Sequence, residues 1–167
     1  MRSLAFLVAL AGAGCSTGFG SGATYDPALA RVVVCGELPH AIELTADELA
    51  KMPRVSETVQ ERDQQELVEG VLMSDVLRRA GAPLEQALRG KALELYVVVE
   101  GADGVRAVFG LAELDPGMTD ERILLIDRKD GQPLAEGEGP LRLVVPADKR
   151  HARWVRQVVR IVVGRVP

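Results

Sequence analysis

The segment that decides the fold spans residues 139–163 and reads GPLRLVVPADKRHARWVRQVVRIVV. Two apolar runs, at 141–145 and 155–163, are rich in β-branched residues and predict the last two strands of the chain. The loop between them, at 146–154, concentrates positive charge in an otherwise acidic chain. Its candidate binding residues are Lys149, Arg150, His151 and Arg153.

The chemistry of this loop suits a small anion. Arginine side chains form forked hydrogen bonds with oxyanions, a lysine adds a point charge, and exposed backbone amides add further donors. The same composition is also typical of a solvated charged turn that binds nothing. The sequence therefore leaves two interpretations of the loop, an anion-binding site and a surface turn.

Length and composition fit one globular domain. The chain has 167 residues, of which 47% are hydrophobic and only 4% aromatic, so its core must rely on Val, Leu, Ile and Ala. The formal net charge is −4 at pH 7. This charge argues against a nucleic-acid partner, because affinity for phosphate backbones comes from an excess of clustered Lys and Arg.

The first 30 residues have the pattern of an export signal followed by a flexible tether. Residues 1–14 combine a positive charge at Arg2, a short apolar run and a small-residue cleavage site, AGA, that ends at Ala13. Residues 15–30 begin with Cys15 and are rich in Gly, Ser, Thr and Ala. We expect an exported protein, either periplasmic after cleavage behind Ala13 or tethered to the membrane through a lipid on Cys15.

The second cysteine, Cys35, lies in a β-branched run. A disulfide between Cys15 and Cys35 can form in an oxidising compartment. The position of Cys15 in a tail rich in Gly and Ser favours a different interpretation. In it, Cys35 is a small buried hydrophobic residue of a strand.

Residues 31–167 predict a single α+β domain of mixed, mostly antiparallel sheets with short helices. Helices are expected at 46–51 behind a capping box from Thr45 to Glu48, at 75–80 with Ser74 as the cap, and as one turn at 111–114. A turn is expected at 128–133, where the sequence contains residues typical of turns. Strands are expected at 31–38, 55–60, 65–70, 92–100, 105–110, 122–126, 141–145 and 155–163, the second and third of them forming a hairpin.

Further motifs follow one another in a fixed order along the domain. They are GELP at 36–39, LTADEL at 44–49, EGVLMSDVL at 69–77, EGADG at 100–104 and DGQPL at 130–134. Together with the segment at 139–163, they resemble the oxidoreductase molybdopterin-binding domains of the sulfite-oxidase type. The resemblance covers residues 32–163, which is nearly the whole domain.

The resemblance implies a domain that holds a molybdopterin, with its phosphate against basic loops. By matching position, Arg150 and His151 fall in the loop that meets the cofactor, and Lys149 lies in the same loop. Arg153 stands where the family has a basic residue before the tryptophan, here Trp154. These residues are the implied cofactor-binding set, and Trp154 is expected to anchor the loop to the core.

Other residues of the matching motifs have less specific roles. Arg142 matches an arginine that is structural rather than ligand-binding. Asp103 and Asp130 match turn positions near the cofactor face, and a purely turn-forming role is the alternative for both. The acids Glu136 and Glu138 lie in a glycine-rich turn, which is typical of a solvated loop.

The chain departs from the family at the metal ligand. Family enzymes place a cysteine at the end of the strand after the first helix, whereas residues 58–63 read TVQERD. Glu61 stands near the missing position, but a hard carboxylate does not reproduce a soft thiolate. Cys35 is a weak candidate for a substitute ligand, and His40 and His151 lack metal-ligand spacing. The leader also carries a single arginine, whereas family enzymes travel folded behind a twin-arginine signal.

Three functions follow from these observations and remain open. The first is an exported domain that holds a pterin or another small anion on the basic loop without oxotransferase turnover. The second is an active molybdenum-dependent oxidoreductase with an atypical ligand set. The third is a degenerate domain with an interaction or structural role and no cofactor, so molybdopterin and no cofactor at all are equally consistent with the sequence.

Overall fold

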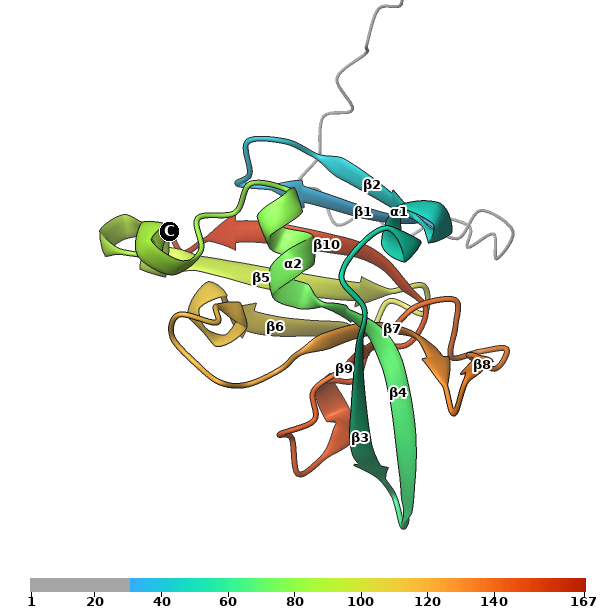
Figure 1. The fold of residues 1–167 in the computed structure, drawn as a ribbon. Helices are drawn as coiled ribbons and strands as arrows, with labels where there is room; N and C mark the ends of the chain where they lie inside the picture. Colours follow the sequence, from blue (N-terminus) through green and yellow to red (C-terminus); the bar gives the residue numbers. More distant parts are fainter. Residues whose placement is uncertain (1–30) are drawn as a thin grey trace, which may run out of the picture.

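The computed structural model describes residues 31–167, which form two sheets with short helices around them (Figure 1). The first sheet has the strand order β2-β1-β10-β5-β6. Within it, β1 and β10 are parallel and the other pairs are antiparallel. Its strands are β1 (Arg31–Gly36), β2 (Ile42–Thr45), β5 (Leu95–Gly101), β6 (Arg106–Gly110) and β10 (Val158–Arg165).

The second sheet is antiparallel throughout, with the order β3-β4-β7-β8 and with β9 also paired to β7. Its β3–β4 hairpin, expected from the sequence, projects from the body of the domain (Figure 1). The strands are β3 (Val55–Glu61), β4 (Gln64–Leu72), β7 (Leu124–Lys129), β8 (Gln132–Pro133) and β9 (Arg142–Val144).

The helices are all short. They are α1 (Ala46–Ala50), α2 (Met73–Arg79) and the 3-10 turns η2 (Glu85–Ala87), η3 (Gly90–Glu94), η4 (Leu111–Leu114) and η5 (His151–Arg153). The predicted α+β class with mixed, mostly antiparallel sheets is therefore confirmed. No helix among the described residues is long and apolar enough to cross a membrane.

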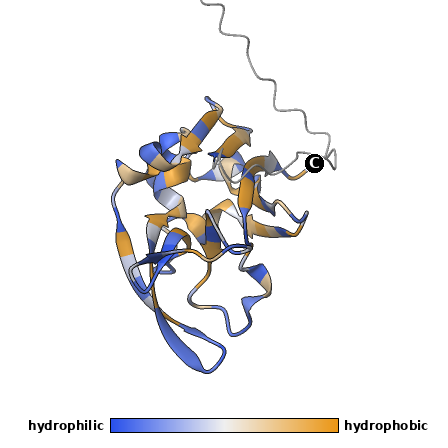
Figure 2. Ribbon diagram, turned by 90° about the vertical axis from the view of Figure 1, so that its right-hand side faces the viewer, coloured by the Kyte–Doolittle hydropathy of each residue, from blue (hydrophilic) through white to orange (hydrophobic). Residues whose placement is uncertain are grey.

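The core is built from aliphatic side chains, as the low aromatic content requires. Strand alternation turns one face of the first sheet inward, and Val34, Val97 and Ile161 on that face are fully buried. Leu77 of α2 and Ile126 of β7 are buried in the same core. Hydrophobic colour follows the sheets, whereas the tip of the projecting hairpin is hydrophilic (Figure 2).

Several predicted boundaries differ from the structure. β10 starts at Val158 rather than at residue 155, because Gln157 has a positive φ of 46° that interrupts the extended backbone. β5 starts at Leu95, since the preceding residues form η3. β7 runs on to Lys129 and pairs with β8, so part of the expected turn at 128–133 is a tight hairpin.

The helix caps are only partly as expected. Thr45 Oγ1 accepts a hydrogen bond from the Glu48 amide at 3.3 Å, which is half of the predicted capping box. The Glu48 carboxylate does not reach back, because it forms ion pairs with Lys51 and Arg79 instead. The predicted Ser74 cap is wrong, since α2 begins at Met73 and Ser74 lies inside its first turn.

Candidate functional site

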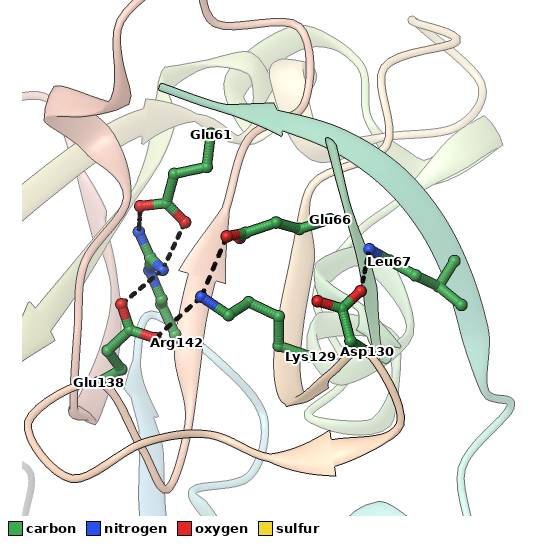
Figure 3. A network of polar contacts seen from close by, with 7 residues as sticks. All are labelled: Glu61, Glu66, Leu67, Lys129, Asp130, Glu138 and Arg142. Atoms are coloured by element: carbon green, nitrogen blue, oxygen red, sulfur yellow. Dashed lines mark hydrogen bonds and ion pairs between the residues drawn. The ribbon is translucent and has the colours of Figure 1, made fainter. Parts of the chain in front are cut away.

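Arg142 lies at the centre of a buried ion-pair network. It is 2% exposed on β9, and its Nη1 and Nη2 donate hydrogen bonds to the two carboxylate oxygens of Glu61 at 3.0 and 2.8 Å (Figure 3). Nη1 also donates to Glu138 Oε1 at 3.1 Å. The guanidinium carbon lies 5.3 Å from the centre of the Trp154 ring, within the range of a cation–π contact. The predicted structural role of Arg142 agrees with these contacts.

Lys129 extends the network from β7. Its Nζ lies 3.3 Å from Glu66 Oε1 on β4 and 3.7 Å from Glu138 Oε2 (Figure 3). Three buried atoms of the network have no hydrogen-bond partner among the described residues, namely Glu66 Oε2, Glu138 Oε2 and Arg142 Nε. The network thus connects the β3–β4 hairpin to β7, β9 and the loop that holds Glu138.

This arrangement corrects the interpretation of Glu138 as a solvated loop residue. The glycine-rich turn folds back so that Glu138 faces Arg142, and its side chain is only 19% exposed. Glu66 and Lys129 were also missed as site residues. Nothing in the sequence pairs them, because their contact depends on how β4 and β7 are aligned in the second sheet.

A cavity of about 400 Å³ opens beside this network. Its lining residues are all polar or charged and include both signs of charge. The lining residues are Glu61, Arg62, Asp63, Gln64, Glu66, Lys129, Glu138 and Arg156. The cavity therefore adjoins the position at which the resemblance expects the metal-ligating cysteine.

The hydrogen bonds from Arg142 lower the pKa of the Glu61 carboxyl, and this effect outweighs the opposing effect of burial. The positive charges of Arg142 and Lys129 act in the same direction. Glu61 is therefore a carboxylate at neutral pH, with both of its oxygens committed to Arg142.

In the basic loop, Arg153 is committed to interactions within the fold. It donates to both carboxylate oxygens of Asp148 at 3.0 and 2.7 Å and to Glu113 at 3.1 Å. Its guanidinium also lies over the ring of Phe109 at 4.7 Å. The hydrogen bonds from Arg153 to Asp148 raise the pKa of Arg153, so its charge is permanent. Arg153 fixes the shape of the loop, and two acidic side chains balance its charge.

The other members of the loop differ in exposure. His151 stacks on Trp154 with ring centroids 4.0 Å apart. Trp154 is buried and donates from Nε1 to the Val145 carbonyl at 3.1 Å, in keeping with its predicted role as a core anchor. Lys149 and Arg150 are exposed, and their side chains form no ion pair or hydrogen bond within residues 31–167. Lys149 and Arg150 do not line the cavity beside the Arg142 network.

Asp103 and Asp130 both act as turn residues. Asp103 Oδ1 accepts a hydrogen bond from the Val105 amide at 3.0 Å in the β5–β6 turn. Asp130 Oδ1 accepts one from the Leu67 amide at 2.9 Å and so ties the β7–β8 turn to β4. The geometry supports the turn-forming alternative for both residues.

Cys35 lies in β1 of the first sheet, whereas Glu61 ends β3 of the second. Cys35 is 1% exposed, as expected for a buried strand residue, but it is also disulfide-bonded, so the interpretation without a disulfide, which the sequence favoured, is wrong. A disulfide sulfur is not a thiolate and does not supply the proposed substitute metal ligand. The predicted signal peptide, the tether and Cys15 lie outside the described residues.

The two packed sheets, the β3–β4 hairpin and the basic loop before the last strand define an α+β domain of the sulfite-oxidase-type molybdopterin-binding fold. The model of the oxidoreductase molybdopterin binding domain family matches residues 64–167, more than half of the chain. The chain therefore belongs to this family. The match begins directly after residues 58–63, where the resemblance leads us to expect the metal-ligating cysteine.

One solved structure with a similar fold is that of the sulfane dehydrogenase SoxCD from Paracoccus pantotrophus. The TM-score is 0.65 and the sequence identity 22%, over 87% of this chain and 40% of that one. The chain therefore corresponds to less than half of that protein's length. The search of the curated proteins gave no match.

The residues present do not fit a thiolate-bound molybdenum centre. No thiol lies at residues 58–63, and both oxygens of Glu61 are hydrogen-bonded to a buried arginine. Among residues 31–167, no group of three or more His, Cys, Asp or Glu side chains could hold a metal ion. The network can fix the hairpin and carry fixed charge, but it offers no soft ligand to a metal.

Proposed function

We propose that this chain is an exported family member that binds a small anion, such as the phosphate of a pterin, through Lys149 and Arg150. It does not transfer oxygen atoms on a thiolate-bound molybdenum. The observation that supports the second statement is the bidentate contact between Arg142 and Glu61, near the position at which the resemblance expects the thiol. The first statement is supported by the two cations of the basic loop that have no partner within residues 31–167.

The Glu61–Arg142 contact opposes metal ligation for an energetic reason. Moving Glu61 towards a metal would leave the Arg142 guanidinium, which is almost completely buried, without its main counter-charge. Separating a buried ion pair costs several kcal/mol, on the order of 3–5. A carboxylate held in this way is therefore a poor replacement for a cysteine ligand.

The loop geometry supports anion binding because different residues hold the loop in shape and face the solvent. Arg153 is held by Asp148 and Glu113 and gives the loop a defined shape. Lys149 and Arg150 then project from a fixed backbone into solvent, where they can contact a phosphate or carboxylate group. Exposed cations that act as a pair bind weakly, so we expect a ligand with at least two negative charges.

A second function, a domain kept for interaction or structure without a cofactor, is favoured by a separate observation. Arg142, Arg153 and His151 all have partners inside the fold, so the positions of these side chains are explained without a ligand. On this alternative, Lys149 and Arg150 are ordinary surface residues.

Metal analysis and pterin fluorescence test the proposal, on protein recovered from the envelope of a cell that makes molybdopterin. We expect pterin without stoichiometric molybdenum in the wild type, and loss of the pterin in Lys149→Gln/Arg150→Gln with unchanged circular dichroism. The control is Arg89→Gln/Arg128→Gln, which removes two other exposed arginines. Stoichiometric molybdenum would refute the proposal, and absence of both pterin and metal would leave the second function.

A further inference from the structure

Cys35 lies on the face of the first sheet that points away from the core. Its neighbour Val34 is fully buried in the core, and successive strand side chains point to opposite faces. The strand registers place Cys35, Val162, Val98 and Val108 side by side in one row across β1, β10, β5 and β6. The outer face of the sheet therefore carries an apolar row.

This row is covered at one end and open at the other. Val108 on the edge strand β6 is 57% exposed, whereas Cys35 is 1% and Val98 is 6% exposed. Neither Cys35 nor Val98 belongs to the hydrophobic core formed by the described residues. The core therefore does not account for their burial, and a cover on the outer face is needed.

We propose that this cover is the segment between Cys15 and β1, fixed by a disulfide between Cys15 and Cys35. Cys35 is disulfide-bonded, and the chain has two cysteines, so Cys15 is its one possible partner within a single molecule. The segment leads directly into β1 at Arg31, four residues before Cys35 on the same strand.

The length of the segment allows this arrangement. Residues 16–30 can reach on the order of 50 Å when fully extended. Cys35 lies four residues into β1, roughly 13 Å from Arg31 at the rise of a strand. The segment can therefore turn back over the sheet and still have length to lie across the apolar row.

The cross-link excludes the lipid anchor in the same molecule. Two thiols give up two protons and two electrons to form the S–S bond, and the disulfide of a thiol oxidase accepts them and becomes a dithiol. The Cys15 sulfur is then no longer available for a thioether to a lipid. The inference predicts a molecule cut behind Ala13 and released, independently of whether Lys149 and Arg150 bind an anion.

Peptide mapping of the full-length gene product, expressed with its own leader and exported, tests this inference. The protein is alkylated without reductant, digested and analysed by mass spectrometry. We expect one linked pair of peptides, containing Cys15 and Cys35, and an intact mass lower by two hydrogens than that of the reduced chain. A lipid on Cys15, two alkylated cysteines, or a Cys35–Cys35 linkage between two chains would each overturn it.

A second measurement tests the cover itself. Limited proteolysis within residues 16–30 should accelerate when the wild type is reduced, because the segment is released from the sheet. Cys35→Ser keeps a small side chain in β1 and should show the fast rate with or without reductant, with Cys15 open to alkylation. Equal rates in oxidised wild type and Cys35→Ser would refute the proposed cover.

Discussion

Arg142 on β9 and Glu61 at the end of β3 are 81 residues apart in the chain and form two parallel hydrogen bonds of 3.0 and 2.8 Å. The pair lies where the family resemblance expects a thiolate–metal bond. Both side chains come from the second sheet, but β3 and β9 are not adjacent strands in it. The ion pair therefore connects two separate parts of this sheet beside the polar cavity.

Arg142→Met should destabilise the domain strongly. The substitution keeps an apolar stem but leaves Glu61 and Glu138 with buried charge and no arginine. We expect a loss of about 3–5 kcal/mol in the free energy of unfolding, measured by urea denaturation. Arg128→Met is the control, since Arg128 is exposed on β7, and should change stability by less than about 0.5 kcal/mol. A loss below about 1 kcal/mol for Arg142→Met would contradict the importance of the network.

The network should also make stability depend on pH. Arg142 lowers the pKa of Glu61 in the folded protein, so the pair contributes fully above the unfolded pKa of about 4.3. This contribution is lost as the pH falls through the lower, folded pKa. The difference in unfolding free energy between wild type and Glu61→Gln should be constant from about pH 7 to 5 and shrink below about pH 4. A difference that grows on acidification would show the opposite shift.

Trp154 should contribute through both its ring and its indole N–H. Trp154→Phe keeps most of the packing but loses the hydrogen bond to the Val145 carbonyl, so we expect a loss of about 1 kcal/mol. Trp154→Ala also removes the surface on which His151 stacks and should cost about 3–5 kcal/mol. The chain has one tryptophan, so unfolding of both variants is followed by far-ultraviolet circular dichroism. Equal losses would mean that ring packing contributes little.

Gly70→Ala tests how closely β4 and β7 approach each other. A methyl group at Gly70 would collide with the backbone of Leu125 and Ile126 on β7, and a backbone cannot move aside as a side chain can. We expect a loss of about 1–3 kcal/mol in thermal or urea unfolding. Gly110→Ala is the matched control, because its nearest neighbour would be the flexible Glu113 carboxylate at 3.6 Å. Similar effects at the two positions would argue against the close approach.

The element pattern was largely predictable from local sequence. Alternating and β-branched runs located the β3–β4 hairpin and the strands β1 and β6, because side-chain periodicity reflects which face is buried. Errors occurred where one residue changes the backbone, as at Gln157 before β10. They also occurred where a tertiary contact takes the place of a local cap, since the Met73 amide at the start of α2 donates to the Ile123 carbonyl at 2.9 Å. Periodicity carries no information about such positions.

The candidate site was predictable only in part. The basic loop and Trp154 were recognised because charge and an aromatic residue are concentrated in a short segment. Glu66 and Lys129 were not recognised, since their contact is defined by the pairing of strands that are distant in sequence. Glu138 was not recognised because its contact with Arg142, four residues further on, depends on how the glycine-rich turn folds back. The signs of the charges were visible in the sequence, but their pairing was not.

The sequence alone determined the α+β class, the family and the absence of a thiol at residues 58–63. These three properties depend only on which residues the chain contains and on their order, and neither changes on folding. Only the tertiary structure decided that Arg142 fills the position beside Glu61 and that Arg153 is neutralised by Asp148 and Glu113. Whether a charged side chain can bind a ligand or forms an ion pair inside the protein depends on which charges folding brings within hydrogen-bond distance. Once such a pair is buried, separating it is costly because a buried charge is left without a partner.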